Sequence, residues 1–319
     1  MKIALVLTGQ LRTIELTKWF HKNIFLNKEN CDVFLSIDPN NKTQLLYKNK
    51  TEKTNNLLIN QIIDFYKPKD FYIGNTDDEK IIKEEYKNLV NNPIVFYDIN
   101  DINEDSQKNI NKFIINNEYQ YMKDKINIVD IKNISYNFGE KHKGCLTEAS
   151  IKGLFNQFYY VHKGYELLNN YKNKENINYD LIIRMRFDHI LLDNNLIDNF
   201  DQINNTILYH EKNIILAQSL GNINIELDSI NYNTINVMGA GVYKKYLYVN
   251  DFFWTHGNDL IDKMLKFYPQ LNKIIHFAMN NYFPIYGAGI EHYLALFLYN
   301  NNINIKQTIM NKCNIIREY

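Results

Sequence analysis

The segment Tyr179–Asp193, with the sequence YDLIIRMRFDHILLD, constrains the structure more than any other part of this chain. Apolar residues open and close the run, which is typical of a buried β-strand. Between them lie three charged residues spaced two positions apart, Arg184, Arg186 and Asp188. Alternate residues of a strand point to the same face of a sheet. We therefore predict that the three charges share one face, and that Met185 and Phe187 point into the core.

These charges indicate a ligand. Burying a charge in the middle of a strand is costly unless the charge is paired or binds a charged partner. Two arginines beside one carboxylate suit a diphosphate and its bound metal ion, and we expect all three side chains to face one solvent-accessible cleft. The alternative is an internal bridge in which Asp188 only orients Arg184 or Arg186. Such a bridge needs one arginine, which favours the ligand-binding interpretation.

Composition argues against several classes of protein. Lys+Arg and Asp+Glu both number 36 among 319 residues, so the formal net charge is zero, which disfavours general attraction to nucleic acid or anionic membrane. The cysteines, Cys31, Cys145 and Cys313, are odd in number and far apart, which favours a reducing compartment over a disulfide framework or zinc site. The first apolar run is too short for a signal peptide, and no stretch reaches the roughly 18 apolar residues of a membrane helix. We expect a cytoplasmic protein without a membrane span.

A strand–helix–strand unit begins the chain. Lys2–Leu7 and Cys31–Ile37 are apolar runs typical of strands, and the stretch around Thr13–Phe25 has helical character. A βαβ unit of this length implies parallel strands. We predict an α/β fold with a mostly parallel central sheet flanked by helices. No linker composition is present, so we expect a single domain over residues 1–319, with a variable or inserted region at about 75–137.

The remaining elements are predicted from apolar periodicity and turn residues. We expect helices at Leu57–Tyr66, Glu79–Val90, Asp105–Lys125, Glu148–Leu168, Asn195–Phe200, Tyr243–Trp254, Asp259–Phe267 and Ile290–Tyr299. We expect further strands at Asp70–Ile73, Asn213–Ala217, Ile235–Val237 and within Ile303–Ile316, and a polar loop at Asn40–Lys53.

The turn after the first strand, Thr8–Arg12, is a candidate phosphate site. Ligands of open α/β sheets bind at the carboxyl ends of strands, and a helix N-terminus there offers backbone N–H groups to phosphate. Gly9 lets the backbone approach a ligand, and Arg12 can reach a diphosphate. Neither GxGxxG nor GxxxxGK[ST] is present, so the chain lacks a dinucleotide fingerprint and a P-loop. An ordinary strand-to-helix turn is the alternative.

A candidate base lies near the C-terminus. Glu291 follows the glycine-containing turn Tyr286–Gly289 and opens a helix, where the helix dipole stabilises a carboxylate. That would be its structural role; the alternative is a general base toward an acceptor hydroxyl. His256 and Asp259 offer two metal ligands without a third, and we predict no metal site there.

Taken together, these segments resemble a group of GT-A-like glycosyltransferase-related proteins found in bacterial surface-polysaccharide loci and large viruses. Members open with an SGQxR-type turn and a vDvFxxxwd-type strand, and later carry an NQFYS-type helix, a YDxxIRxRFD strand and an ExxL helix. The matching segments here are LVLTGQLRT (Leu5–Thr13), CDVFLSID (Cys31–Asp38), FNQFYYVHKGYELL (Phe155–Leu168), YDLIIRMRFD (Tyr179–Asp188) and IEHYLALFLYNNNINI (Ile290–Ile305). They follow the same order over nearly the whole chain, apart from Asn40–Asn137.

The resemblance implies transfer of a sugar from a nucleoside-diphosphate donor to a hydroxyl of a glycan or glycolipid acceptor. Asp188 would be the counterpart of the DxD-type metal-binding aspartate, with manganese or magnesium as the cation, and Glu291 the counterpart of the catalytic base. This chain has RFD in place of DxD, so the arginines could replace part of the cation's charge. The implied nucleotide-binding residues are Thr8, Gly9, Gln10, Arg12, Asp38, Gln157, Arg184 and Arg186.

Two other functions remain open from the sequence. A nucleotidyl- or phospho-transferase would use the same arginines and would differ in the donor that it binds. A catalytically inactive carbohydrate-binding protein on the same fold would bind without hydrolysing any donor.

Overall fold

The chain is seen here in a computed structural model. It describes residues 2–26, 30–45, 48–53, 56–91, 148–192, 234–237, 240–243, 246–249, 251, 253–281, 290–307 and 312–315.

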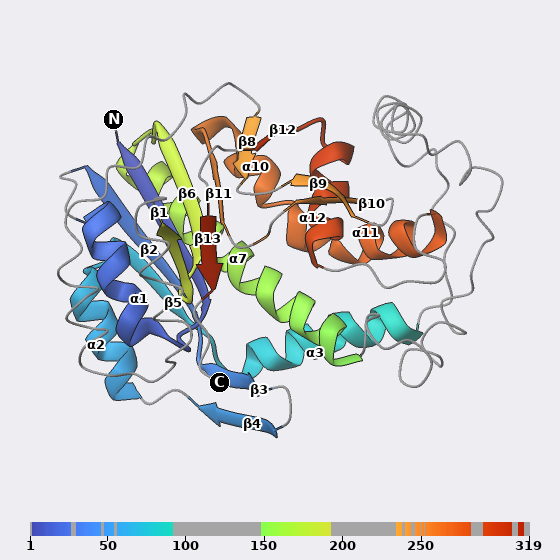
Figure 1. The fold of residues 1–319 in the computed structure, drawn as a ribbon, viewed down its shortest axis with the longest axis horizontal. Coiled ribbons are helices and arrows are strands. Elements are labelled where there is room, and N and C mark those ends of the chain that lie inside the picture. Colours follow the sequence, from blue (N-terminus) through green and yellow to red (C-terminus); the bar gives the residue numbers. More distant parts are fainter. Residues whose placement is uncertain are drawn as a thin grey trace.

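A seven-stranded sheet forms the centre of the described structure (Figure 1). Strand β11 runs antiparallel to its neighbours β6 and β8, while the other neighbouring pairs are parallel. The predicted α/β fold with a mostly parallel sheet is confirmed. From one edge to the other the strands are β12 (Asn304–Gln307), β8 (Thr234–Val237), β11 (Phe253–His256), β6 (Leu181–Arg186), β1 (Ile3–Gln10), β2 (Cys31–Asp38) and β5 (Asp70–Ile73).

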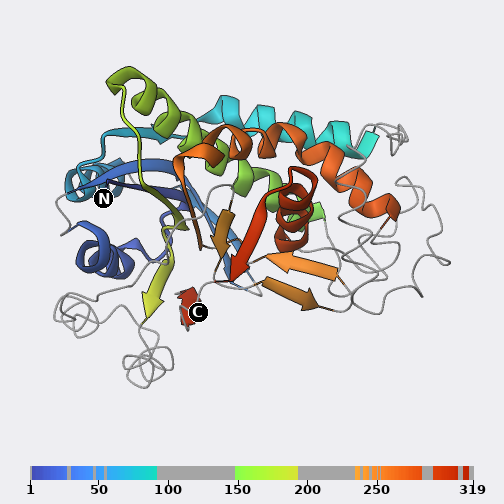
Figure 2. The ribbon, with the colours of Figure 1, turned by 90° about the horizontal axis from the view of Figure 1, so that it is seen from above.

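Helices cover both faces of this sheet. Figure 2 shows α7 with α3 and α11 along one face, and α1 on the other. The helical elements are α1 (Ile14–His21), a π-helical turn (Lys22–Leu26), α2 (Asn56–Tyr66), α3 (Thr76–Asn91), α7 (Glu148–Glu175), a 3-10 turn (Asn258–Leu260), α10 (Ile261–Met264), α11 (Phe267–Asn281) and α12 (Ile290–Asn300).

The strand period of two separates the core into two clusters. On β1, Ala4 and Val6 pack with α7, whereas Leu5 and Leu7 pack with residues of α1 and α2. The same alternation holds on β6, where the predicted inward-facing Met185 lies in the α1–α2 cluster. The side chains at the even positions of β6 therefore face α7.

Three short antiparallel pairs complete the described strands: β3 (Asn40–Leu45) with β4 (Lys48–Lys53), β9 (Ala240–Tyr243) with β10 (Tyr246–Val249), and β7 (His189–Leu192) with β13 (Lys312–Ile315). Three predictions are wrong here. The polar loop is a hairpin, the strand predicted over Tyr179–Asp193 breaks at a turn into β6 and β7, and the helix predicted at Tyr243–Trp254 is replaced by strands.

A physical reason underlies the last error. Every residue of β11 is buried, so its sequence shows no alternation that would separate a strand from a buried helix.

The predictions at Asp105–Lys125, Asn195–Phe200, Asn213–Ala217 and Tyr286–Gly289 lie outside the described residues, as does most of the expected variable region. The single domain stays a prediction.

The strand order reverses at β1. The chain moves from β1 to β2 and β5 on one side, and then returns to place β6 on the other side of β1. In open α/β sheets, ligands bind outside the carboxyl ends of the strands at such a switch point. The ends of β1 and β6 are therefore where a ligand is expected.

Two glycines of α7 test how closely this helix packs on β1. A Cβ on Gly164 would lie 2.8 Å from Val6 Cγ1 and 3.0 Å from Thr8 Cγ2, whereas a Cβ on Gly153 would meet nothing within 4 Å. We expect Gly164→Ala to lower the free energy of unfolding by about 1–3 kcal/mol through overpacking. The matched control Gly153→Ala should raise it by about 0.5–1 kcal/mol, because alanine is the better helix former. Urea unfolding of both variants measures the difference, and equal stabilities would contradict the close packing.

Candidate functional site

Residues at the carboxyl ends of β1, β2 and β6 lie side by side. We call this end of the sheet its carboxyl edge. In the strand register, Thr8 of β1 lies opposite Arg186 of β6, and Gln10 of β1 lies opposite Asp38 of β2. Between them Gly9 has a φ of +107°, which residues with a side chain rarely adopt. Glycine at this position therefore allows the positive φ angle near the end of β1, where the strand order reverses.

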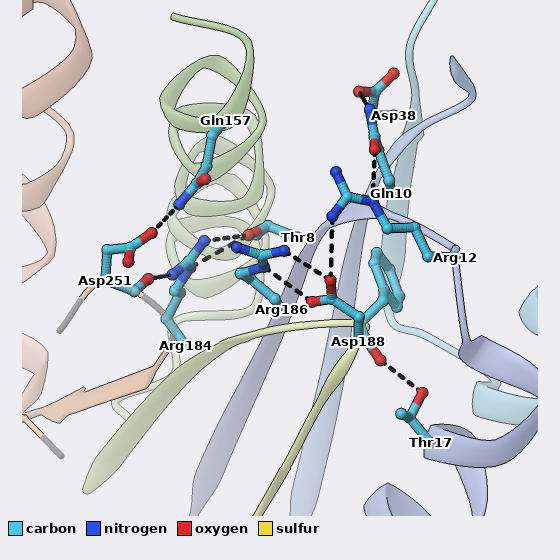
Figure 3. A network of polar contacts seen from close by, with 11 residues as sticks. Thr8, Gln10, Arg12, Thr17, Asp38, Gln157, Arg184, Arg186, Asp188 and Asp251 are labelled. Carbon is cyan, nitrogen blue, oxygen red and sulfur yellow. Dashed lines mark hydrogen bonds and ion pairs between the residues drawn. The ribbon is translucent and has the colours of Figure 1, made fainter. Parts of the chain in front are cut away.

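Asp188 holds two arginines at this edge (Figure 3). Arg186 donates from Nε to Oδ1 at 2.8 Å and from Nη2 to Oδ2 at 2.6 Å, while Arg12 Nη1 lies 3.6 Å from Oδ2. The Asp188 side chain is 2% exposed, whereas 15% of Arg186 and 23% of Arg12 reach solvent. The turn Thr8–Arg12 and the charged segment are therefore in contact.

The charges of the two arginines keep Asp188 ionised. Burial by itself raises the pKa of this carboxyl, but the charge and hydrogen bonds of Arg186, with the charge of Arg12, outweigh burial and hold the pKa below its usual value. The result is a buried anion that fixes two partly exposed cations next to each other.

Arg184 has a different environment. Its side chain is fully buried, donates from Nε and Nη2 to Thr8 Oγ1 at 3.2 and 3.0 Å, and donates from Nη1 to the backbone carbonyl of Asp251. The guanidinium carbon lies 4.3 Å from the ring centre of Trp254. Burial lowers its pKa to about 10, although the nearby Asp251 charge opposes this shift.

The expectation that Arg184, Arg186 and Asp188 all face a solvent-accessible cleft is therefore wrong for Arg184 and Asp188, because both side chains are buried and contact protein groups. In this arrangement Arg184 acts on the site through the residues that it holds. Its predicted contact with a nucleotide stays a prediction.

Asp38 forms a second polar centre at the same edge. It is fully buried and accepts hydrogen bonds at Oδ2 from the side-chain amides of Gln10 and Asn156, and at Oδ1 from the backbone N–H of Asn40. Gln10 also accepts from Arg12 Nε through Oε1 at 2.9 Å. Gln10 thus connects the Asp38 centre with the Asp188 ion pair.

The sequence did not indicate Asp251 as a site residue. It lies two positions before β11, and its Oδ2 accepts a hydrogen bond from Nε2 of Gln157, a predicted nucleotide-binding residue on α7 (Figure 3). The antiparallel pairing of β11 with β6 brings Asp251 to the carboxyl edge. No local motif marks this position, so only the pairing could reveal it.

Buried hydrogen bonds hold the turn that carries Asp188. Thr17 of α1 donates to the carbonyl of Phe187 at 2.6 Å, and His21 Nε2 lies 2.7 Å from the carbonyl of His189. Because a carbonyl only accepts, His21 Nε2 carries the hydrogen and Nδ1 accepts from the Tyr66 hydroxyl at 2.6 Å. Both neighbours of Asp188 are therefore anchored to α1.

Glu291 belongs to the first turn of α12. Its side chain lies outside the described part of the structure, so its expected role as a base stays a prediction.

A divalent cation does not fit the described arrangement of Asp188 directly. Both carboxylate oxygens bind Arg186, and the described residues contain no group of three or more His, Cys, Asp or Glu side chains that could hold a metal ion. A metal at Asp188 would need this residue to exchange at least one arginine hydrogen bond for a metal bond.

No protein-family model matches the sequence, and a comparison with curated proteins finds no similar one. None of the helices in the described ranges combines the length and apolar character needed to cross a membrane.

Replacement of Asp188 tests the ion pair. Asp188→Asn keeps the shape of the side chain but leaves Arg12 and Arg186 without their counter-charge. Removing one partner of a buried pair costs roughly 3–5 kcal/mol, and we expect the lower end because both arginines reach solvent. The free energy of unfolding in urea measures the loss.

Asp77→Asn is the matched control, because Asp77 pairs with Lys80 at 2.8 Å on the surface, where both side chains are about three-quarters exposed. That change should alter stability by less than about 1 kcal/mol. Equal losses of unfolding free energy in the two variants would contradict a stabilising role of the buried Asp188 ion pair.

Buried histidines predict a dependence of stability on pH. Burial lowers the pKa from 6.5 to about 4 for His21 and His256 and to about 3 for His189. Between pH 6.5 and 4 the unfolded chain binds protons that the folded chain does not, so their contribution is complete above pH 6.5 and is lost as the pH falls toward 4. We expect the free energy of unfolding to fall by up to about 1.4 kcal/mol per pH unit for each histidine. Urea unfolding between pH 7 and 5 measures this slope. His21→Gln should reduce the slope by up to about 1.4 kcal/mol per pH unit, because unfolding then takes up as much as one proton fewer. An unchanged slope would contradict the burial of His21.

Proposed function

We propose that this protein is a GT-A-like glycosyltransferase that moves a sugar from a nucleoside-diphosphate donor to a hydroxyl of a glycan or glycolipid acceptor. The observation that supports it best is the pair Arg12 and Arg186, held by Asp188 at the switch point of the sheet. Two fixed cations at that position suit a ligand with two adjacent phosphates.

In this proposal the arginines supply the electrostatic part of the reaction. The bond between the sugar and the diphosphate breaks, and negative charge develops on the departing diphosphate. Cations already held in place stabilise that charge without having to reorganise, which is a major source of rate enhancement. Arg12 and Arg186 would contact the phosphates, and Arg184 would position Thr8 and the end of β1.

The side-chain amides of Gln10 and Asn156 would bind the nucleoside. Both are partly exposed and are held by the buried Asp38 carboxylate, and Gln10 connects them to Arg12. Amide groups can recognise hydroxyls and base edges through hydrogen bonds. Asp38 and Gln10 would therefore lie on the nucleoside side of the diphosphate, and Gln157 on the opposite side of Arg184.

Two parts of the proposed mechanism rest on the resemblance alone. Glu291 would take the proton from the acceptor hydroxyl if the reaction inverts the sugar configuration. A manganese or magnesium ion would supply further positive charge to the phosphates if Asp188 exchanged an arginine hydrogen bond for a bond to the metal.

Binding without transfer is the second candidate function. It is favoured by the bidentate contact of Arg186 with Asp188, because this contact occupies the carboxylate that a catalytic metal would use. The comparison of donor binding with donor turnover separates the two functions. Transfer of a phosphoryl or nucleotidyl group from the donor, in place of the sugar, would identify a phospho- or nucleotidyl-transferase.

The proposal is tested by a thermal-shift and calorimetry screen against UDP, GDP, CDP and their common sugar conjugates, with and without Mn²⁺. We expect at least one nucleoside diphosphate to bind the wild-type chain. Arg12→Gln should weaken that binding by roughly 10- to 100-fold, as expected for loss of a hydrogen bond to a charged group.

Lys80→Gln is the control, because it removes an equal charge from an exposed position, where Lys80 pairs with Asp77. It should leave the affinity unchanged within about twofold. Absence of binding by every nucleotide, or an equal loss in both variants, would contradict the proposed diphosphate site.

A further inference from the structure

Within the described part of the structure, one carboxyl oxygen at the carboxyl edge lacks a hydrogen-bond donor. Asp251 is 1% exposed, and among the described residues its Oδ1 is buried without a partner. Burial of an unpaired acceptor costs free energy, so this oxygen is a candidate for a contact with a ligand.

The surrounding contacts fix this carboxyl group. Gln157 donates to Oδ2, and Arg184 donates to the backbone carbonyl of the same residue. The side chain and the backbone of Asp251 are therefore both held, and Oδ1 is not free to turn toward Gln157 without losing the first bond. Figure 3 shows Asp251 on the side of Arg184 that faces away from Asp38.

The register places Asp251 beside the proposed phosphate site. β11 is antiparallel to β6, with Phe253 opposite Met185, so residues before β11 lie beyond the carboxyl end of β6. Arg186 ends β6 and lies on the same face as Arg184. Asp251 is thus separated from the nucleoside-side residues by the arginines, on the side where the group attached to the diphosphate would extend.

The chemistry of the missing partner is that of a neutral donor. The negative charge of Asp251 raises the pKa of Arg184, so the two charges lie close enough to interact. The positive charge of Arg184 disfavours a second cation at the same place. The described residues also contain no set of three metal-ligating side chains. A hydroxyl group meets the need of Oδ1 for a hydrogen without bringing a charge.

We propose that Asp251 Oδ1 accepts a hydrogen bond from a hydroxyl of the sugar carried by the donor. This inference rests on the proposed function and adds to it a residue that distinguishes the sugar from the nucleotide.

The test compares nucleotide with nucleotide sugar. The affinities of UDP, GDP, UDP-glucose, UDP-galactose, UDP-N-acetylglucosamine and GDP-mannose are measured by calorimetry for the wild-type chain and Asp251→Asn. In this variant the amide oxygen can keep the Gln157 bond, so an NH₂ group replaces the acceptor oxygen. We expect the affinity for the nucleoside diphosphate to change by less than about twofold, and that for the nucleotide sugar to fall roughly tenfold or more.

Asp262→Asn is the control, since this exposed aspartate lies on the short helix α10. Deoxy analogues of the bound nucleotide sugar provide the second measurement. Removal of the hydroxyl that contacts Asp251 should weaken binding to the wild-type chain by a similar factor and cause no further loss in the variant. If Asp251→Asn does not fold, Asp251→Ser takes its place in the same measurements.

The outcomes are distinguishable. Loss of nucleotide and nucleotide-sugar binding by the same factor would make Asp251 a structural partner of Arg184 and overturn this inference, as would no change in either affinity. Failure of the wild-type chain to bind any nucleoside diphosphate would overturn the proposed function and this inference together.

Discussion

The site depends on the hydrogen bonds that the buried guanidinium of Arg184 donates. Arg184 joins the end of β1 through Thr8, the middle of β6 through its own backbone, and the approach to β11 through Asp251. A buried cation is tolerated only when its donors are satisfied, and here a hydroxyl, a carbonyl and the face of Trp254 do so. The end of β1, the middle of β6 and the segment before β11 therefore keep their relative positions as one unit.

This unit extends into helix α7 through a chain of hydrogen bonds. Trp254 Nε1 donates to the Tyr165 hydroxyl at 2.8 Å, and that hydroxyl lies 2.6 Å from His256 Nε2. His256 Nδ1 donates to the carbonyl of Gly257, so Nε2 must accept and the tyrosine must donate. The ring that supports Arg184 is thus itself fixed, and α7 is tied to the same strands that carry the site.

The two arginines of β6 show how position along a strand divides structural and ligand-binding roles. Arg184 and Arg186 point to the same face, but Arg184 is enclosed by the core whereas Arg186 lies at the end of the strand, where part of it reaches solvent. Asp188 keeps Arg186 in place, and the hydrogen bonds of Thr17 and His21 hold the turn around Asp188. A cation at the end of a strand can therefore be both ordered and accessible to a ligand. A cation enclosed by the core is ordered but not accessible.

The sequence by itself indicated the first βαβ unit, the strand that carries Arg184 and Arg186, and the turn Thr8–Arg12 as a candidate phosphate site at a strand end. Apolar runs, alternation and the rule that parallel strands end at one edge are local or topological signals that survive without coordinates. It could not determine that Arg184 is buried, because Arg184 and Arg186 have the same spacing and the same chemistry. That difference depends on Trp254 and Asp251, which lie about seventy residues away and arrive through the antiparallel strand β11. Only the tertiary structure decided it, since the free energy of a charge depends on the groups that surround it rather than on its neighbours in the chain.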